Sequence, residues 1–316
     1  MSKTINGASA AIIFKNMHSA LQSPVGATVV IGGKTYDYFA GCGYLGLQNH
    51  PQVLASARQA LDTYGLSTAT SRGGYGEHAV YAEVEQQAST YFGCEKACYF
   101  ASGYLGMGIL VQSDRKPNDH LFLDDYGHYS LWEAAQTTNQ PITVFPHGNV
   151  QRLEELLKSE LHRGERPLVL SDGVFPVSGE IAPVPEYLIL VEKYNGILYL
   201  DDAHAVGTIG AHGRGTLDYF GIYHPHCHST GTLSKALGGW GGILWGEKHW
   251  VENLECTSAV LSAASPPPLP VAAASARALE IAATQPQLRR RLWDNVHLAR
   301  QGLNRLGWEL EDSPVP

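Results

Sequence analysis

Lys235 lies in Thr230–Gly242, the segment of the sequence whose residue types point most clearly to a catalytic site. It directly follows a predicted strand, and its neighbours are hydroxyl residues and glycines with no carboxylate among them. A lysine removed from water loses part of its preference for the ammonium form and becomes a nucleophile toward carbonyl carbon. An exposed lysine in a glycine loop would have the same local sequence, so Lys235 alone does not decide the chemistry.

Two other segments carry groups that complement such a lysine. Asp201 and His204 end an almost wholly apolar strand pattern, and a carboxylate buried there needs a cationic or donor partner. Ser102-Gly103-Tyr104 separates a predicted strand from a predicted helix, where backbone amides and a glycine suit a phosphate. Each segment has an ordinary alternative, a loop cap or a tight turn. Together with Lys235 they form the set that pyridoxal phosphate requires: a Schiff-base lysine, an acid for the pyridine nitrogen and a phosphate cradle.

Short apolar strands alternate with helical patterns along most of the chain, which predicts an α/β fold with a mostly parallel sheet flanked by helices. In such sheets, ligands bind beyond the carboxyl ends of the strands, where the groups above are expected. A glycine turn at Gly32-Gly33 predicts a hairpin between residues 28–31 and 35–39. The predicted strands are 97–100, 120–123, 142–145, 167–170, 197–200, 228–232 and 242–245. The predicted helices are 51–64, 79–92, 105–112, 130–136, 150–161, 185–194, 269–283 and 287–306.

Composition excludes several classes of protein. With 22 Lys+Arg against 30 Asp+Glu, the net charge is -8, which argues against a nucleic-acid or anionic-membrane partner. Five scattered cysteines do not form a secreted disulfide framework, and neither a signal peptide nor a membrane span of ~18 apolar residues is found. We therefore expect a cytoplasmic protein. The low share of charged residues, 16%, favours an oligomer with a hidden surface.

Histidines occur at two other places of interest. His128 follows a predicted strand end, where its ring could cover one face of a cofactor, although a loop histidine is usually at the surface. His224, His226 and His228 resemble a metal cluster, but alternate residues of a short segment point in opposite directions. We therefore expect no metal site.

These residues, in this order and spacing, resemble the α-oxoamine synthase family of pyridoxal phosphate enzymes, which have the aspartate-aminotransferase-like fold (fold type I). The resemblance runs from about Tyr38 to the end of the chain. Its landmarks are Tyr44-Leu-Gly-Leu47, Ser71-Arg72, Ser102-Gly103-Tyr104, His128, His147, Asp172-Gly-Val-Phe175, Asp201-Asp-Ala-His204, Gly213-Arg-Gly215 and Thr232-Leu-Ser-Lys235.

The resemblance implies a Claisen-type condensation of an amino acid with an acyl-coenzyme A thioester, usually with loss of carbon dioxide. Lys235 would carry the cofactor, Asp201 would keep its pyridine nitrogen protonated, and His128 would stack on its ring. His204 would bond the phenolic oxygen and share proton transfer with Lys235. The implied cofactor-binding residues are Ser102, Gly103, Tyr104, His128, Asp172, Asp201, His204, Thr232, Ser234 and Lys235. A homodimer with shared active sites is also implied.

Several positions depart from the family pattern. Cys42-Gly43 replaces a usual Asn-Asp, Met107 a usual asparagine, Asp172 a usual glutamate and Pro176 a usual serine. These changes keep open another reaction on the same cofactor, such as that of an aldolase, decarboxylase or aminotransferase. A truncated, non-catalytic dimer partner is a further alternative.

The resemblance also divides the chain into an N-terminal arm (1–38), a large cofactor domain (39–268), and a linking helix with the start of a small domain (269–316). The family continues past Pro316 with an arginine that grips the substrate carboxylate, so we expect the small domain to be incomplete.

Overall fold

A computed structural model describes residues 20–308, 310 and 313–316 of the chain. It contains two compact units, one ending at Gly41 and the other spanning Cys42–Pro316. In the first unit, β1 (Thr28–Ile31) pairs antiparallel with β2 (Lys34–Asp37). Gly32 and Gly33 form the turn with φ values of 56° and 74°, a region that glycine enters without steric cost. The predicted hairpin is confirmed.

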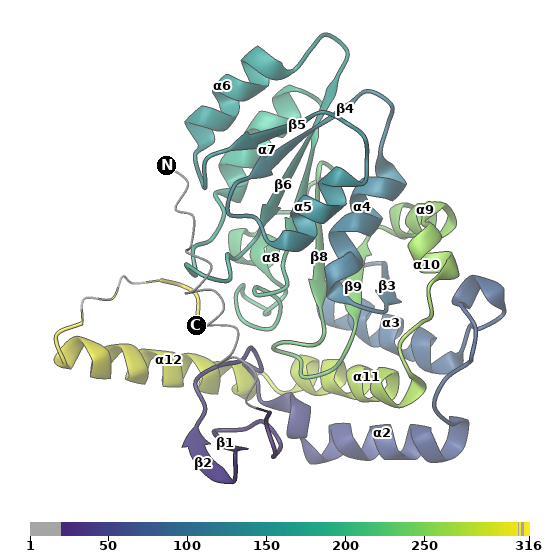
Figure 1. The fold of residues 1–316 in the computed structure, drawn as a ribbon, viewed down its shortest axis with the longest axis vertical. Helices are drawn as coiled ribbons and strands as arrows, with labels where there is room; N and C mark the ends of the chain where they lie inside the picture. Colours follow the sequence, from purple (N-terminus) through teal and green to yellow (C-terminus); the bar gives the residue numbers. More distant parts are fainter. Residues whose placement is uncertain (1–19, 309, 311–312) are drawn as a thin grey trace. The chain divides into compact units, whose positions relative to one another are not determined.

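The second unit is built on a seven-stranded sheet of order β3-β9-β8-β7-β6-β4-β5 (Figure 1). Neighbouring strands are parallel except where β9 pairs with β3 and with β8, so β9 runs against the others. The strands are β3 (Lys96–Phe100), β4 (Asp119–Asp124), β5 (Ile142–Phe145), β6 (Arg166–Asp172), β7 (Ile197–Asp201), β8 (Cys227–Thr232) and β9 (Gly242–Gly246). The predicted mostly parallel sheet is confirmed.

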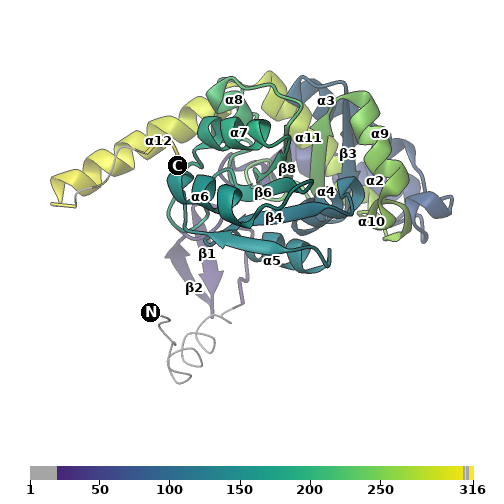
Figure 2. The ribbon, with the colours of Figure 1, turned by 90° about the horizontal axis from the view of Figure 1, so that it is seen from above.

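Helices cover both faces of this sheet (Figure 2). On one face, α4, α5, α9 and α10 enclose an apolar cluster that includes Met107, Leu121 and Leu254. On the other face, α3 and α11 pack around Tyr99, and α6, α7 and α8 pack around Phe122. These helices are α3 (Ala79–Phe92), α4 (Gly106–Asp114), α5 (Tyr129–Gln136), α6 (Val150–Glu160), α7 (Val184–Lys193), α8 (Thr216–Phe220), α9 (Lys248–Thr257), α10 (Ala259–Ala263) and α11 (Leu269–Thr284).

Two further helices flank this core: α2 (Pro51–Tyr64), whose Val53 packs with Ala278 of α11, and α12 (Gln287–Arg305), in which no residue is buried. Proline occupies the first turn of α2, where its missing N–H costs nothing. Short 3-10 helices η1 (Leu47–Asn49), η2 (Arg72–Gly74) and η3 (Gly103–Leu105) complete the unit. Within the described residues, no helix has the length and apolar character needed to cross a membrane.

The structure differs from the sequence predictions mainly in short elements. The helix predicted for 105–112 extends to Asp114 and is preceded by η3, which brings Gly103 into the helix start. Helices α8, α9 and α10 were not predicted; α8 and α10 have five residues each, too few for a helical repeat of apolar residues to be visible. The strand direction matters most for function. Because β3, β4, β6, β7 and β8 run the same way, their carboxyl ends meet at one edge.

Candidate active site

Lys235 follows the carboxyl end of β8 and is half-buried. Leu233 and Leu237 on either side of it are fully buried, so the loop is anchored to the core and the lysine between them is held in place. Burial lowers the pKa of Lys235 below its usual value, while Asp201 and Asp172 act in the opposite direction. The lowered pKa raises the share of neutral amine, which is the nucleophilic form.

Asp201 is the last residue of β7 and is 5% exposed. One carboxylate oxygen accepts the backbone N–H of Ala203 at 3.0 Å, and the other accepts the Ser130 hydroxyl at 3.5 Å. Burial raises the pKa of Asp201, and Lys235 opposes that shift. The carboxylate therefore lies in a poorly solvated place, where it would interact strongly with a cationic partner.

Asp172 ends β6 directly opposite Asp201 in the parallel register. Its Oδ2 accepts the backbone N–H of His128 at 2.8 Å. Burial, and then the charge of Asp201, raise the pKa of Asp172 to about 8. Asp172 is thus mainly protonated at neutral pH, which spares the site a second buried negative charge.

His128 is the N-cap residue of α5, and its ring nitrogen Nδ1 accepts the N–H of Ser130 at 3.3 Å. The same Nδ1 lies 2.8 Å from the Ser130 hydroxyl, which also reaches Asp201. The ring of Tyr104 meets the His128 ring edge-on at 5.9 Å between centroids. These contacts fix the orientation of the imidazole. The sequence did not single out Ser130, whose link between His128 and Asp201 becomes visible only when β4 and β7 are placed in one sheet.

His204 lies three residues beyond Asp201, and its Nδ1 is 3.0 Å from the Tyr44 hydroxyl. Burial, followed by the charge of Lys235, lowers the pKa of His204 to about 4, so the imidazole is neutral at pH 7. Burial, followed by Cys42, raises the pKa of Tyr44, so its hydroxyl stays protonated. Tyr44 belongs to a family landmark but was not predicted as a site residue, because the contact spans 160 positions of sequence.

Ser102, Gly103 and Thr232 form a close-packed turn at the same edge. Ser102 caps η3 by accepting the N–H of Tyr104 at 3.3 Å. A Cβ added to Gly103 would lie 2.6 Å from the Cβ of Thr232, so only glycine allows this approach. The Thr232 and Ser234 hydroxyls are 2.8 Å apart. Hydroxyls and helix-start amides thus gather in one place, a donor set suited to a phosphate.

The sheet therefore brings together all ten predicted site residues around the carboxyl ends of β3, β4, β6, β7 and β8. The donor set fits pyridoxal phosphate in three respects. Lys235 supplies an amine of lowered pKa, Asp201 a buried carboxylate, and the Ser102–Gly103 turn with Thr232 a phosphate cradle. These residues follow the ends of five different strands, so the sequence alone does not show whether they lie together.

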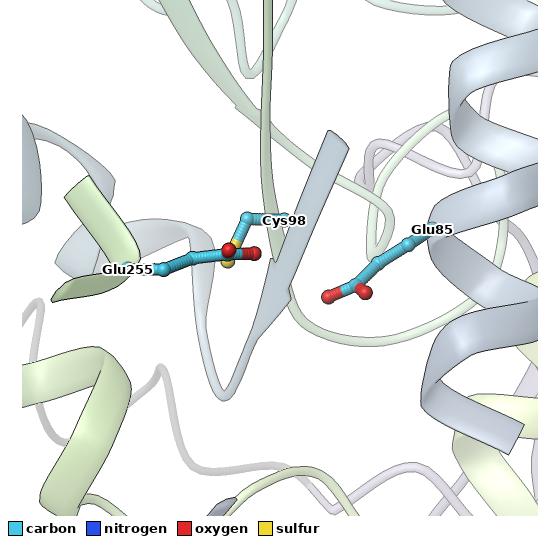
Figure 3. Close-up of side chains that lie close together, drawn as sticks. All are labelled: Glu85, Cys98 and Glu255. Carbon is cyan, nitrogen blue, oxygen red and sulfur yellow. The ribbon is translucent and has the colours of Figure 1, made fainter. Parts of the chain in front are cut away.

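Glu85 of α3, Cys98 of β3 and Glu255 of α9 are near enough to suggest a metal site, with ligand atoms within 4.8 Å of one another (Figure 3). Both carboxylates already have cationic partners, however: Glu85 is 2.6 Å from Arg72, and Glu255 is 2.6 Å from Lys96. Burial raises the pKa of Cys98 well above its usual value, which disfavours the thiolate that binds metals. This cluster is better described as two ion pairs around a buried thiol.

The three histidines of 224–228 have separate partners. His224 accepts the N–H of His226, His226 lies 2.6 Å from the Gly196 carbonyl, and His228 stacks on a tryptophan.

The comparisons with known proteins show the family of this chain. The sequence matches the family "Aminotransferase class I and II" over residues 42–315. It is 33% identical to an 8-amino-7-oxononanoate synthase of Coprothermobacter proteolyticus, over 93% of this chain and 75% of that protein. The chain belongs to the α-oxoamine synthase family. The similarity to a serine palmitoyltransferase of Bacteriovorax stolpii is 30%, over 94% of this chain and 71% of that one.

Solved structures of family members extend the similarity to the fold. The serine palmitoyltransferase of Sphingomonas wittichii superposes with a TM-score of 0.90 at 25% identity, over 98% of this chain and 78% of that one. A serine palmitoyltransferase carrying pyridoxal phosphate superposes with a TM-score of 0.89 at 26% identity, over 98% of this chain and 80% of the other. The fold is fold type I, the cofactor is pyridoxal phosphate, and the chain is a pyridoxal-phosphate-dependent acyltransferase, as the sequence analysis predicted.

Proposed function

We propose that this enzyme condenses an α-amino acid with an acyl-coenzyme A thioester, with the ten residues above as its active site. The observation that carries this proposal is that Lys235, Asp201 and the Ser102–Gly103 turn lie at one edge of the sheet. The relatives of this chain include an 8-amino-7-oxononanoate synthase and a serine palmitoyltransferase. When bound, pyridoxal phosphate supplies the electron sink that makes the α-carbon of an amino acid acidic.

We assign the binding of the cofactor to four groups of residues. Lys235 would hold the cofactor covalently through its amine. Asp201, buried at 5% exposure, would pair with the pyridine nitrogen and keep a proton on it. The ring of His128, fixed by Ser130 and Tyr104, would pack against the pyridine. The hydroxyls of Ser102, Thr232 and Ser234, with the amides of Gly103 and Tyr104, would hold the phosphate.

The proton steps fall to His204 and Lys235. His204 is neutral at pH 7 because its pKa is lowered to about 4. Its second ring nitrogen can therefore accept a hydrogen bond from a hydroxyl, or donate one to an oxygen, of the cofactor or substrate. Its other nitrogen is held by Tyr44, which sets the direction of the ring. Burial lowers the pKa of Lys235, which raises the share of neutral amine that can accept a proton.

The test is an assay of thiol release by purified protein loaded with pyridoxal phosphate, using a panel of amino acids and acyl-coenzyme A thioesters. We expect thiol release that needs both substrates and disappears in Lys235→Ala. Lys193→Ala is the matched control, because Lys193 is an exposed lysine paired with Glu154. Amino-acid turnover without thiol release would instead assign an aldolase, decarboxylase or aminotransferase reaction. Absence of bound cofactor in the pure wild-type protein would support a non-catalytic dimer partner.

We also propose that the enzyme is a cytoplasmic homodimer with shared active sites, and that residues 1–38, 39–268 and 269–316 are its arm, cofactor domain and small-domain start. The low charged fraction, 16%, supports a hidden subunit face. Light scattering on the pure protein measures the subunit number, cell fractionation the location, and limited proteolysis the domain limits. A monomeric holoenzyme with full activity would contradict shared sites.

A further inference from the structure

A cavity of about 870 Å³ lies at the edge of the sheet opposite the active site. Its walls include Arg166, Ile197 and Cys227, the first residues of β6, β7 and β8, and Gly246, the last residue of β9. Because β9 runs against its neighbours, all four residues stand at the amino edge, whereas Asp201 stands at the carboxyl edge. The cavity is therefore separate from the site described above. Its volume falls in the range of small-molecule pockets, roughly 300–1,000 Å³.

Aromatic rings make up much of the cavity wall. Phe92 stacks on Trp245 with 3.9 Å between centroids, and His228 stacks on Trp250 at 4.0 Å; both ring pairs are 8° from parallel. Burial lowers the pKa of His228 to about 4, so this ring is uncharged at pH 7 and adds to the apolar surface. Flat aromatic surfaces of this kind favour a planar, largely apolar ligand.

One cation in the wall is without an ionic partner. Arg214 donates its Nε–H to the Tyr91 carbonyl at 2.7 Å, and no carboxylate oxygen in the described part of the chain lies within 4.0 Å of its guanidinium. A Cβ on Gly93 would lie 2.6 Å from an Arg214 terminal nitrogen. The guanidinium is therefore seated flat against a glycine, with terminal N–H groups left for an acceptor.

The other arginine of the wall is already paired, since Arg166 is 2.7 Å from Asp119. Hydrogen-bond donors already contact the wall carboxylates Glu95, Asp114, Asp218 and Glu247. Arg214 is thus the cation of the wall with the clearest capacity for a new ionic contact, and an anionic oxygen is what a free guanidinium binds best.

We propose that this amino-edge cavity binds a planar aromatic acid, with its ring system against the aromatic wall and its anionic group on Arg214. The observations supporting this assignment are the cavity volume, the two stacked ring pairs and the Arg214 guanidinium, which has no ion pair among the described residues. The site does not depend on the reaction assigned above, since none of its residues belongs to the ten of the active site.

The probes are 2-naphthoate and its uncharged isostere 2-naphthamide, titrated into the holoenzyme while tryptophan fluorescence and the heat of binding are recorded. We expect 2-naphthoate to quench tryptophan fluorescence and to bind at least about tenfold more tightly than 2-naphthamide, since a charge-assisted hydrogen bond is stronger than a neutral one. The visible absorbance of the lysine-bound cofactor should not change. Equal binding of the two probes, no binding of 2-naphthoate up to its solubility limit, or displacement of the cofactor would overturn the proposal.

Arg214→Gln should reduce 2-naphthoate affinity to that of 2-naphthamide and leave 2-naphthamide binding unchanged. Arg152→Gln is the matched control, because Arg152 is an exposed helix residue paired with Glu155. Unaltered 2-naphthoate binding by folded Arg214→Gln would refute the role of Arg214. Should that variant fail to fold, the comparison of the two probes on wild-type protein decides the matter.

Discussion

Asp172 and Asp201 stand directly opposite each other at the carboxyl ends of β6 and β7, and both carboxyl groups are buried. Ionising both of these neighbouring buried carboxyl groups costs electrostatic free energy, so the two groups titrate as a pair. The two carboxyl groups differ in their hydrogen-bond donors. The Asp201 carboxylate accepts hydrogen bonds from Ser130 and Ala203 and faces Lys235. The Asp172 carboxyl accepts the backbone N–H of His128, and its pKa is raised to about 8.

The first prediction concerns the pH dependence of stability in the cofactor-free protein. The pKa of Asp172 is raised from 3.8 to about 8 on folding. Between these two pH values the folded protein holds a proton that the unfolded chain releases. The contribution of Asp172 to the free energy of unfolding is therefore present in acid and is lost as pH rises toward 8. Asp172→Asn should remove that loss and increase the free energy of unfolding at about pH 8, relative to wild type, by more than about 1 kcal/mol.

Urea unfolding of both proteins at several pH values measures this difference. His204 acts in the opposite sense, since its lowered pKa favours folding as pH rises from about 4 to 6.5. It is present in both proteins and cancels in the comparison. Parallel pH curves for wild type and Asp172→Asn would show that Asp172 ionises normally.

The second prediction concerns Asp201. Asp201→Asn keeps the size of the side chain but removes the negative charge that, in our proposal, would hold a proton on the pyridine nitrogen. We expect thiol release to fall by about 100-fold or more, with the cofactor still bound through Lys235. Steady-state rates and cofactor stoichiometry are the measurements. Asp294→Asn, an exposed position of α12, should be active at the wild-type level. An Asp201→Asn enzyme within about threefold of wild type would remove Asp201 from the mechanism.

The third prediction concerns the hydrogen bond between Tyr44 and His204. Tyr44→Phe removes the hydroxyl 3.0 Å from Nδ1 and frees the imidazole to turn. Loss of one hydrogen bond of about 1 kcal/mol should lower kcat by about fivefold, while cofactor affinity stays near that of wild type. Tyr64→Phe, at a half-exposed tyrosine, is the control. Equal kcat values in the two variants would count against the role of Tyr44.

The fourth prediction concerns Gly103. In Gly103→Ala, the new Cβ would lie 2.6 Å from the Cβ of Thr232, so the turn must open. We expect a loss of about 1–3 kcal/mol in unfolding free energy and weaker cofactor binding, measured by urea titration and by cofactor release on dialysis. Gly108→Ala in the same segment meets only the Gln112 amide at 3.8 Å. It should be neutral or stabilise α4 by up to about 1 kcal/mol, because alanine favours the helix. Equal effects of the two substitutions would contradict the close packing at Gly103.

The sequence by itself predicted the fold class and the cofactor, both of which are confirmed, and it supplied the candidate residues of the active site. Apolar strands alternating with helical patterns are local signals, and Lys235, Asp201 and Ser102–Gly103 each follow a predicted strand, so their position at a strand end could be read directly. The hairpin at Gly32-Gly33 was predictable for the same reason. The short helices α8 and α10 were not, since five residues are too few to show a helical period.

Only the tertiary structure decided which of these parts touch. Tyr44 reaches His204 across 160 positions and Ser130 reaches Asp201 across 71, and no local pattern encodes such distances. The opposition of Asp172 and Asp201 depends on the strand order, which places β6 beside β7. The pKa shifts of Asp172, His204 and Lys235 have burial as their first cause, and burial is a property of the packed molecule and not of the residue. The same holds for Arg214: that it has no ionic partner in the described part of the chain appears only once the amino edge of the sheet is assembled.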